Sequence, residues 1–269
     1  MATSLSDIKC FLLDLDGTFI LGNRLIEGSV RFLDVLQAQG KEFLFLTNNS
    51  SKHRRMYAEK LNRLGVSIPE TLIFTSGEAT SIYLKNIRPA ARLYVVGTPA
   101  LEDEFRSSGF ILTEDTPDIA VLGFDTTLTY AKLWRLCDVV RSGLPYVATH
   151  PDFNCPTETG FMPDIGAMIA FVKASTGREP DQVIGKPNRF IVDAASHKLN
   201  LPIDALAMVG DRLYTDIALG ASSSITTVLV LSGETSPDDL KCSAFQPTYT
   251  FENLGYLANR LTEAANGLL

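Results

Sequence analysis

Short apolar runs alternate with segments of helical periodicity over most of the chain. This alternation is typical of α/β proteins, in which helices connect mainly parallel strands. In the first part of the chain, glycines at the ends of the helical segments favour helix termination there. The pattern predicts strands at residues 8–15, 42–46 and 72–75, and helices at residues 29–39 and 52–64.

The same rhythm continues through the middle of the chain, where it forms a self-contained set of elements. Residues 149–163 interrupt it, because they are rich in Pro, Asn, Asp, Thr and Gly, and we predict a loop there. The other segments predict strands at residues 92–96, 119–123 and 144–148, and helices at residues 100–107, 130–142 and 167–175.

The last part of the chain resumes the first pattern, with an apolar run at 183–184, a helix at 190–199 and a strand at 205–209. We therefore predict a doubly wound parallel-sheet α/β core formed by two halves, with an α/β domain inserted between them. The predicted boundaries are residues 1–79 and 181–269 for the core and residues 80–180 for the insertion, with hinges near residues 76–77 and 177–180.

Composition narrows the classes of function. The 269 residues are 45% hydrophobic and 20% charged, which is enough to bury a large core and argues against disorder. The net charge is −7, so no overall positive field attracts nucleic acid or anionic lipid. We expect neither as a partner.

Several features favour a cytoplasmic protein. The four cysteines have no CxxC spacing, which favours reduced thiols over a disulfide framework or a structural zinc site. Asp14 interrupts the first apolar stretch, so no signal peptide is predicted. The longest apolar runs, such as residues 165–172, are too short to span a bilayer.

Four polar motifs carry the candidate chemistry. Three directly follow predicted strands and the fourth follows a short apolar run, so all four are expected at the carboxyl edge of the sheet, where open α/β sheets bind ligands. The motifs are Asp-x-Asp-Gly-Thr at 14–18, Thr-Asn-Asn at 47–49, Gly-Lys-Pro at 185–187 and Gly-Asp-x4-Asp at 210–216.

These residue types together indicate phosphoryl transfer. The carboxylates of Asp14, Asp16 and Asp211 form an oxygen-rich set suited to Mg²⁺. A metal ion and Lys186 would neutralise charge on a transferred phosphoryl group. Gly185-Lys186 is not a Walker P-loop, because the required earlier glycine is absent and Pro187 replaces Ser or Thr.

In order and spacing, the four motifs resemble those of the haloacid dehalogenase (HAD) superfamily. Within it, the chain is similar to the p-nitrophenylphosphatase-like, or NagD, branch, whose large α/β cap (type 2) would occupy the interval between Asn48 and Lys186. The resemblance covers essentially the whole chain. It implies a Mg²⁺-dependent phosphatase that hydrolyses small phosphorylated metabolites, such as sugar phosphates or nucleoside monophosphates, through an aspartyl-phosphate intermediate.

The resemblance also implies roles for the residues of the motifs. Asp14 is the nucleophile, and Asp16 is the general acid and base, whose backbone carbonyl also ligates Mg²⁺. Asp211 is a further metal ligand, and Asp216 orients bound water or Lys186 from behind the metal ligands.

The remaining candidate residues concern the phosphate and the cap. The Thr47 hydroxyl and the Asn48 backbone amide hold phosphate oxygens, and Lys186 neutralises phosphate charge and steadies the nucleophile. His150 departs from the family pattern, in which Asn is common at this position. It opens a polar loop with Asp152, and these two residues are candidates for contacting the leaving group or shaping the interface between cap and core; the alternative is a well-bonded loop.

Two other functions stay open from the sequence. A phosphotransferase or mutase of the same superfamily would pass the phosphoryl group from Asp14 to another hydroxyl. A ligand-binding protein on this fold would have no turnover. The sequence names no substrate, and it is compatible with a homodimer formed through the cap.

Overall fold

The computed structural model describes residues 4–157 and 160–267 of the chain, which form two compact units. Each unit has its own parallel sheet and its own buried side chains. The boundaries predicted from the sequence, at 79/80 and 180/181, stay a prediction. The core unit comprises Met1–Thr47, Ala58–Phe74 and Lys186–Leu269, and the cap unit comprises Asn48–Tyr57 and Thr75–Gly185.

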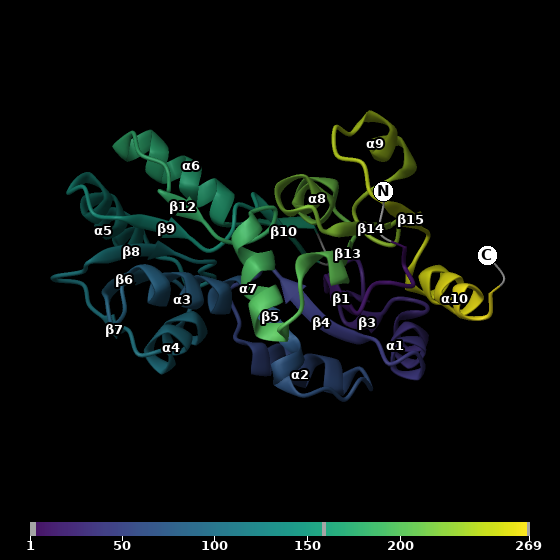
Figure 1. The fold of residues 1–269 in the computed structure, drawn as a ribbon. Coiled ribbons are helices and arrows are strands. Elements are labelled where there is room, and N and C mark those ends of the chain that lie inside the picture. The colour runs from purple at the N-terminus through teal and green to yellow at the C-terminus, as the bar shows by residue number, and fades with distance from the viewer. Residues whose placement is uncertain (1–3, 158–159, 268–269) are drawn as a thin grey trace. The chain divides into compact units, whose positions relative to one another are not determined.

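A six-stranded sheet forms the centre of the core unit, with β1 between β13 and β4 (Figure 1). β1 pairs in parallel with both neighbours, and β14 and β15 extend the sheet in parallel beyond β13. The sheet order is β15-β14-β13-β1-β4-β5. Its strands are β1 (Cys10–Leu13), β4 (Glu42–Thr47), β5 (Ile73–Thr75), β13 (Leu206–Gly210), β14 (Thr226–Val230) and β15 (Tyr249–Phe251).

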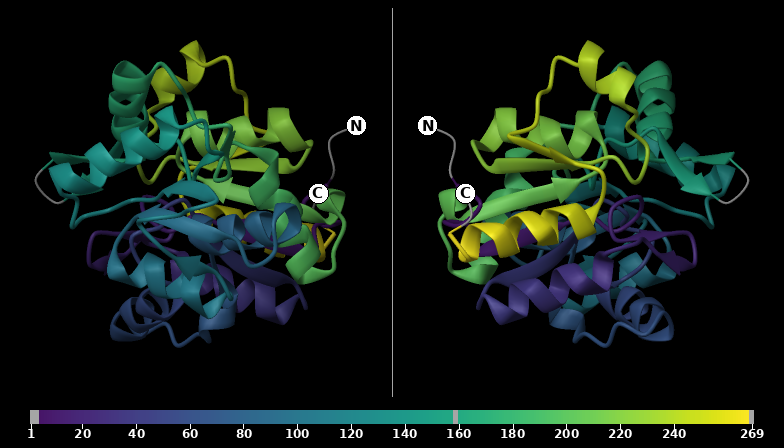
Figure 2. Two further views of the ribbon diagram at one scale, coloured as in Figure 1. Left: turned by 90° about the vertical axis from the view of Figure 1, so that its left-hand side faces the viewer. Right: turned by 90° about the vertical axis from the view of Figure 1, so that its right-hand side faces the viewer.

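The central strands read as continuous apolar runs because they are buried on both faces. Every residue of β1, β13 and β14 is buried, as expected for parallel strands covered by helices. Helices α1 and α10 pack side by side (Figure 2). The helices that contribute to the core unit are α1 (Ser29–Ala38), α2 (Arg54–Arg63), α7 (Arg189–Leu199), α8 (Ala218–Ser223), α9 (Pro237–Cys242) and α10 (Leu254–Ala265).

Shorter elements complete the core unit. A two-stranded ribbon follows the first strand, two short 3-10 turns precede β5 and β13, and a π-helical turn leads into α8. They are β2 (Ile20–Leu21), β3 (Arg24–Leu25), η1 (Glu70–Leu72), η2 (Ile203–Ala205) and η3 (Leu213–Ile217).

The cap unit has a five-stranded sheet of its own, in the order β12-β9-β8-β6-β7, with parallel pairing throughout. The described elements thus confirm the predicted fold class, a parallel-sheet α/β core and a second α/β layer structure. The strands are β6 (Arg92–Val96), β7 (Ile111–Leu112), β8 (Ile119–Leu122), β9 (Tyr146–Ala148) and β12 (Gln182–Val183), and the helices are α3 (Ser76–Ile87), α4 (Pro99–Ser107), α5 (Tyr130–Arg141) and α6 (Ile165–Thr176).

The prediction of a loop over residues 149–163 was wrong in part. Strands β10 (Asn154–Thr157) and β11 (Gly160–Pro163) form an antiparallel hairpin there. Turn-forming residue types dominate the segment, but the hairpin is held by its own ladder and by contact with α6. Residues 158 and 159, between the strands, lie outside the described part of the chain.

Helix α3 was not predicted, and a hinge was expected near its first two residues, 76 and 77. Thr75 caps this helix, because its hydroxyl accepts a hydrogen bond from the Glu78 backbone N–H at 3.1 Å. Thr followed three residues later by Glu is the pattern of a capping box, so the signal was present in the sequence. In the described residues, no helix is long and apolar enough to cross a membrane.

Two carboxylates of the cap unit, Glu78 of α3 and Glu104 of α4, are close enough to interact electrostatically. Oε2 of Glu104 is buried and has no hydrogen-bond partner within the described residues. Burial, and then the charge of Glu78, raise the pKa of Glu104 from 4.5 to about 7. Because the folded state disfavours the ionised form, the free energy of unfolding falls as pH rises from 4.5 to about 7.

Glu104→Gln is therefore expected to stabilise the protein above pH 7, by roughly 1–3 kcal/mol, since an amide has no charge to bury. Near pH 4.5 the parent carboxyl is itself neutral, and the gain should vanish. Thermal unfolding at both pH values measures the difference. Asp103→Asn removes an exposed carboxylate of the same helix and should show no such dependence. Equal stability of Glu104→Gln and the parent at pH 8 would contradict the assignment.

Candidate active site

The strand order of the core sheet reverses between β1 and β13. From β1 the chain continues outward to β4 and β5, whereas from β13 it continues outward in the opposite direction to β14 and β15. Ligands of doubly wound sheets bind at such a switch point, beyond the carboxyl ends of the strands. Asp14 directly follows β1 and Asp211 directly follows β13. The fold thus positions two candidate residues at the expected place.

Three buried carboxylates gather at this edge. Asp14, Asp211 and Asp216 each offer an oxygen atom, and these atoms lie within 4.8 Å of one another. Asp211 and Asp216 come from the segment between β13 and α8, so one short stretch contributes two of the three groups. The structure therefore brings together residues that are about two hundred positions apart in the sequence.

Lys186 is the buried cation of this cluster. Its Nζ donates hydrogen bonds to Asp14 Oδ1 at 2.5 Å, to Asp216 Oδ1 at 2.7 Å and to the Leu46 carbonyl oxygen at 3.2 Å. Only 2% of its surface is exposed. All three donor positions of the ammonium group thus have an acceptor, which fixes Lys186 against the candidate nucleophile.

The electrostatics of the cluster show an excess of negative charge. Burial and the charges of Asp14 and Asp216 raise the pKa of Asp211 to about 8, and burial raises the pKa of Asp216 to about 6 in spite of Lys186. Burial alone would lower the pKa of Lys186, but the two neighbouring carboxylates raise it above its ordinary value. The positive charge of Arg212 lowers the pKa of Asp211 and of Asp216 in part but does not cancel either shift.

A hard divalent cation fits this donor set. The cluster offers only oxygen ligands, which Mg²⁺ and Ca²⁺ prefer, and its excess negative charge is what such an ion would neutralise. Gly17 and Gly233 leave room for the Asp211 carboxylate, because a Cβ at either position would lie 2.3 Å or 2.0 Å from Asp211 Oδ2. Gly17 also has a φ of +91°, which favours glycine.

The groups that hold Asp211 were not predicted from the sequence. The Glu234 backbone N–H donates to Asp211 Oδ2 at 2.7 Å, and the Thr18 hydroxyl donates to Oδ1 at 3.3 Å. Ser232 donates to the Gly17 carbonyl oxygen at 2.8 Å. The signal was a polar Ser-Gly-Glu-Thr cluster just after the apolar run of β14, which is the same arrangement as in the other motifs.

Asp16 lies outside the carboxylate cluster. Its side chain is 43% exposed, and Oδ1 lies 3.8 Å from Lys60 Nζ. This differs from the neighbouring Asp14, which is buried. A carboxylate with access to solvent suits proton exchange with water, which is the role predicted for the Asp16 side chain.

The motif Thr47-Asn48-Asn49 contains the point at which the chain passes from the core unit to the cap unit. Thr47 ends β4, the strand beside β1, and is buried. Asn48 is the first residue of the cap unit, where its side-chain N–H donates to Asp152 Oδ1 at 3.0 Å. Asp152 and His150 are both buried. The two candidate cap residues therefore belong to a well-bonded loop of the cap unit.

Comparison with known proteins identifies the family. A model of haloacid dehalogenase-like hydrolases matches residues 11–111, and a second model, of HAD-hydrolase-like proteins, matches residues 183–257. The acid sugar phosphatase of Staphylococcus saprophyticus subsp. saprophyticus is 35% identical over 258 residues, which cover 96% of this chain and 99% of that protein. The chain belongs to the haloacid dehalogenase-like hydrolases.

Solved structures place this HAD-like hydrolase in the NagD branch. The 4-nitrophenylphosphatase of Thermotoga maritima shares 46% identity, with a TM-score of 0.93 over 95% of this chain and 98% of that one. NagD from E. coli K-12 shares 31% identity, with a TM-score of 0.86 over 92% and 97% of the two chains. The predicted family and enzyme class, a HAD-type phosphatase, are confirmed. Phosphatases of this kind generally use a divalent metal ion.

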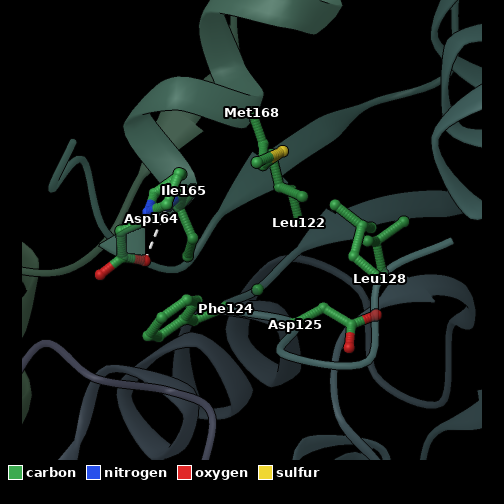
Figure 3. A pocket seen from close by; sticks show the side chains of 10 residues that line it. Leu122, Phe124, Asp125, Leu128, Asp164, Ile165 and Met168 are labelled. Atoms are coloured by element: carbon green, nitrogen blue, oxygen red, sulfur yellow. Dashed lines mark hydrogen bonds between the residues drawn. The ribbon is translucent and has the colours of Figure 1, made fainter. Parts of the chain in front are cut away.

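The cap unit of the HAD-like hydrolase contains a cavity that cannot hold a substrate (Figure 3). Its volume is about 20 Å³, which suits one water molecule. Apolar side chains such as Leu122, Phe124 and Met168 line most of it, together with Asp125 and Asp164. The carboxylate cluster of the core unit is the better candidate for the site of reaction.

Proposed function

We propose that this chain is a Mg²⁺-dependent phosphatase that hydrolyses small phosphorylated metabolites, sugar phosphates first among them, through an aspartyl-phosphate on Asp14. The observation that carries the proposal is the buried contact of Lys186 Nζ with Asp14 Oδ1, within a cluster of carboxylates at the switch point of the sheet. The similarity to an acid sugar phosphatase and a 4-nitrophenylphosphatase supports the substrate class.

In the first step, an oxygen of the Asp14 carboxylate attacks phosphorus, and the bond from phosphorus to the ester oxygen breaks. Asp16 gives its proton to the leaving oxygen, so the products are an alcohol and the aspartyl-phosphate. In the second step a water molecule attacks phosphorus and gives its proton to Asp16. The bond from phosphorus to the Asp14 oxygen breaks, which releases inorganic phosphate and restores both carboxyl groups.

The remaining residues bind charge that develops on the phosphoryl group. Lys186 neutralises phosphate oxygens, and the Thr47 hydroxyl and the Asn48 backbone N–H donate hydrogen bonds to them. Preorganised donors of this kind cost no reorganisation during the reaction, since their positions are fixed by the fold. Asp216 holds Lys186 in place through its 2.7 Å contact.

The Asp14 and Asp211 carboxylates and the Asp16 backbone carbonyl are the groups we assign to Mg²⁺. When bound, the ion would supply positive charge that screens the phosphate from the carboxylates. In this assignment Asp216 is the hydrogen-bond partner of Lys186 and does not bind the metal ion, although its oxygen lies within 4.8 Å of the other two carboxylates. A homodimer and a cytoplasmic location stay predictions from the sequence.

The proposal is tested by measuring inorganic phosphate released from 4-nitrophenyl phosphate and from a panel of sugar phosphates and nucleoside monophosphates. We expect turnover with Mg²⁺, a loss of at least about 10²-fold after EDTA treatment, and recovery on adding Mg²⁺. Comparing kcat/KM across the panel identifies the substrate class. Full activity in EDTA after extensive dialysis would contradict the role of the metal.

The same assay separates the phosphatase from a phosphotransferase. With a free sugar present as acceptor, a phosphotransferase forms a sugar phosphate at the expense of inorganic phosphate. A phosphatase releases one inorganic phosphate for each alcohol formed, whether or not the acceptor is present. We expect the second result, because Asp16 is exposed to water.

A further inference from the structure

The cap unit contains a second group of buried titratable side chains, which the proposed mechanism does not use. His150 is completely buried, and Asp152 and Asp164 are exposed by only 7% and 3%. His150 and Asp152 follow β9, and Asp164 precedes helix α6. Burial of three such groups is unfavourable unless each one has hydrogen-bond partners.

Asp164 orients the imidazole of His150. Its Oδ1 accepts a hydrogen bond from the Ile165 backbone N–H at 2.7 Å, which is the dashed line in Figure 3. The same oxygen lies 3.0 Å from His150 Nε2. An ionised carboxylate only accepts hydrogen bonds, so with an ionised Asp164 the donor of this contact would be Nε2. Asp164 thus caps α6 and fixes the orientation of the imidazole ring.

The loop from His150 to Asp152 lies directly against the first turn of α6. The Gly166 backbone N–H donates to the Asp152 carbonyl oxygen at 2.7 Å. A Cβ at Gly166 would lie 2.5 Å from the Pro151 carbonyl oxygen, so only glycine allows this approach. The loop therefore has little freedom to move away from the helix.

A chain of hydroxyl groups occupies the other side of the imidazole. The Phe124 backbone N–H donates to Ser50 Oγ at 2.9 Å, Ser50 Oγ lies 2.9 Å from Thr149 Oγ1, and Thr149 Oγ1 lies 3.2 Å from His150 Nδ1. If each hydroxyl donates to the next group, the last hydrogen points at Nδ1. Each ring nitrogen of His150 thus has a polar group within hydrogen-bond distance, Asp164 at Nε2 and Thr149 at Nδ1.

The same group of residues holds Asn48 in two places. Asn48 Nδ2 donates to Asp152 Oδ1 at 3.0 Å, and the Asn48 carbonyl oxygen accepts a short hydrogen bond from Ser76 Oγ. Ser76 Oγ also lies 3.4 Å from His150 Nδ1. Both the side chain and the backbone of Asn48 are therefore fixed by the cap unit.

We propose that His150, Asp152 and Asp164 form a positioning network, which fixes the orientation of Asn48 and therefore of its backbone N–H, the group assigned above to the phosphate. The three are positioning residues, because they act on the substrate through Asn48. The proposal rests on the proposed function, since it takes the phosphate-binding role of Asn48 from there. It accounts for a buried His–Asp pair that the reaction itself does not require.

A metal ion bound in the cap is the alternative. One ligand atom from each of the three side chains lies within 4.8 Å of the other two. However, His150 Nε2 already lies within hydrogen-bond distance of Asp164 Oδ1, and Asp152 Oδ1 already accepts a hydrogen bond from Asn48 Nδ2. A hydrogen-bonded network explains these contacts without an ion, and the experiments below separate the two.

The decisive experiment exchanges the two ends of the bond between Asn48 and Asp152. Asn48→Asp places two carboxylates opposite each other with no change in side-chain size, and kcat for 4-nitrophenyl phosphate should fall at least about 10-fold, since small displacements of a phosphate donor are costly. The double variant Asn48→Asp/Asp152→Asn restores one donor and one acceptor. We expect its kcat to return to within about 5-fold of the parent.

Asp138→Asn serves as the matched control, because it removes a half-exposed carboxylate of the cap unit, whose Oδ1 lies 3.1 Å from a guanidinium nitrogen of Arg141. Its kcat should equal that of the parent. If the double variant is no faster than Asn48→Asp, the network does not act through Asn48 and the proposal is wrong. A melting temperature that recovers in the double variant while kcat does not indicates a merely structural role, which also overturns it.

His150 is tested by two replacements. His150→Gln keeps an N–H that reaches Asp164, and kcat should stay within about 5-fold of the parent, whereas His150→Leu should lose at least about 10-fold because Asp164 and the hydroxyl groups lose their partner. Elemental analysis after EDTA dialysis tests the metal alternative. An ion that remains in the parent and is absent from His150→Gln would overturn the proposal.

Failure of this proposal and failure of the proposed function are distinguishable. If Asp14→Asn abolishes turnover and Asn48→Asp retains the parental kcat, only the positioning network is wrong. If Asp14→Asn itself retains the parental kcat, the proposed function is wrong, and the role of Asn48 falls with it.

Discussion

Asp14→Asn is expected to reduce kcat for 4-nitrophenyl phosphate at least about 10⁴-fold, the size of effect seen when a nucleophile is removed from a cooperating site. The amide has the shape of the carboxylate but cannot form the aspartyl-phosphate. Lys186 can still donate a hydrogen bond to its oxygen, so the fold should be retained. Steady-state phosphate release and thermal unfolding measure the two effects separately.

Asp16→Asn provides the informative comparison. Nitrophenolate leaves without a proton, so the first step should still proceed, whereas the second step loses its general base. We therefore expect a burst of nitrophenolate and a phosphorylated protein, detectable by mass spectrometry as one added phosphoryl group. Asp193→Asn, an exposed aspartate paired with Arg189, is the control and should leave kcat unchanged. A folded Asp14→Asn protein with near-parental activity would refute the assignment of the nucleophile.

The strands of the core were predictable because they are buried on both faces. β1 and β13 read as continuous apolar runs, and their buried residues leave no polar position to obscure the pattern. The convergence of Asp14 and Asp211 followed from the rule that parallel strands end at a common edge. Periodicity and topology were thus sufficient to bring distant acidic residues together.

The hairpin of the cap and the pairing of His150 were not predictable in the same way. β10 and β11 are short and rich in turn-forming residues, so no apolar alternation marks them. Because the hairpin reverses the chain, Asp164 returns to the loop after β9, and its backbone N–H donates to the Phe153 carbonyl oxygen at 2.9 Å. Only this geometry pairs His150 with Asp164; neither residue carries a signal for it.

The groups around Asp211 were missed for a different reason. Glu234 contributes only its backbone N–H, and Gly17 and Gly233 contribute the absence of a side chain. A backbone donor and an absent side chain leave no signature of their own, so the polar cluster after β14 points to this segment without showing its contacts. The acidic side chains of the candidate metal site are therefore visible in the sequence, whereas the contacts that position Asp211 are visible only in the fold.

Lys186→Met is expected to lower kcat at least about 10³-fold and to destabilise the protein, because a buried ammonium that touches two carboxylates is removed. In EDTA at pH 8.5, we expect the free energy of unfolding to fall by about 3–5 kcal/mol, the usual cost of breaking a buried ion pair from one side. Denaturant unfolding measures it.

The loss of stability should shrink at low pH, and the sign follows from the carboxyl groups. Asp211 and Asp216 have pKa values raised to about 8 and about 6, and removing Lys186 raises that of Asp216 further. Near pH 5 both are protonated in the folded variant, so less unbalanced charge remains buried. Lys241→Met, which removes an exposed lysine, should change neither kcat nor this pH dependence. If Lys186→Met were as stable as the parent at pH 8.5, the buried charges would not interact as the structure indicates. The role assigned to Lys186, which is to hold Asp14 in position, would then be wrong.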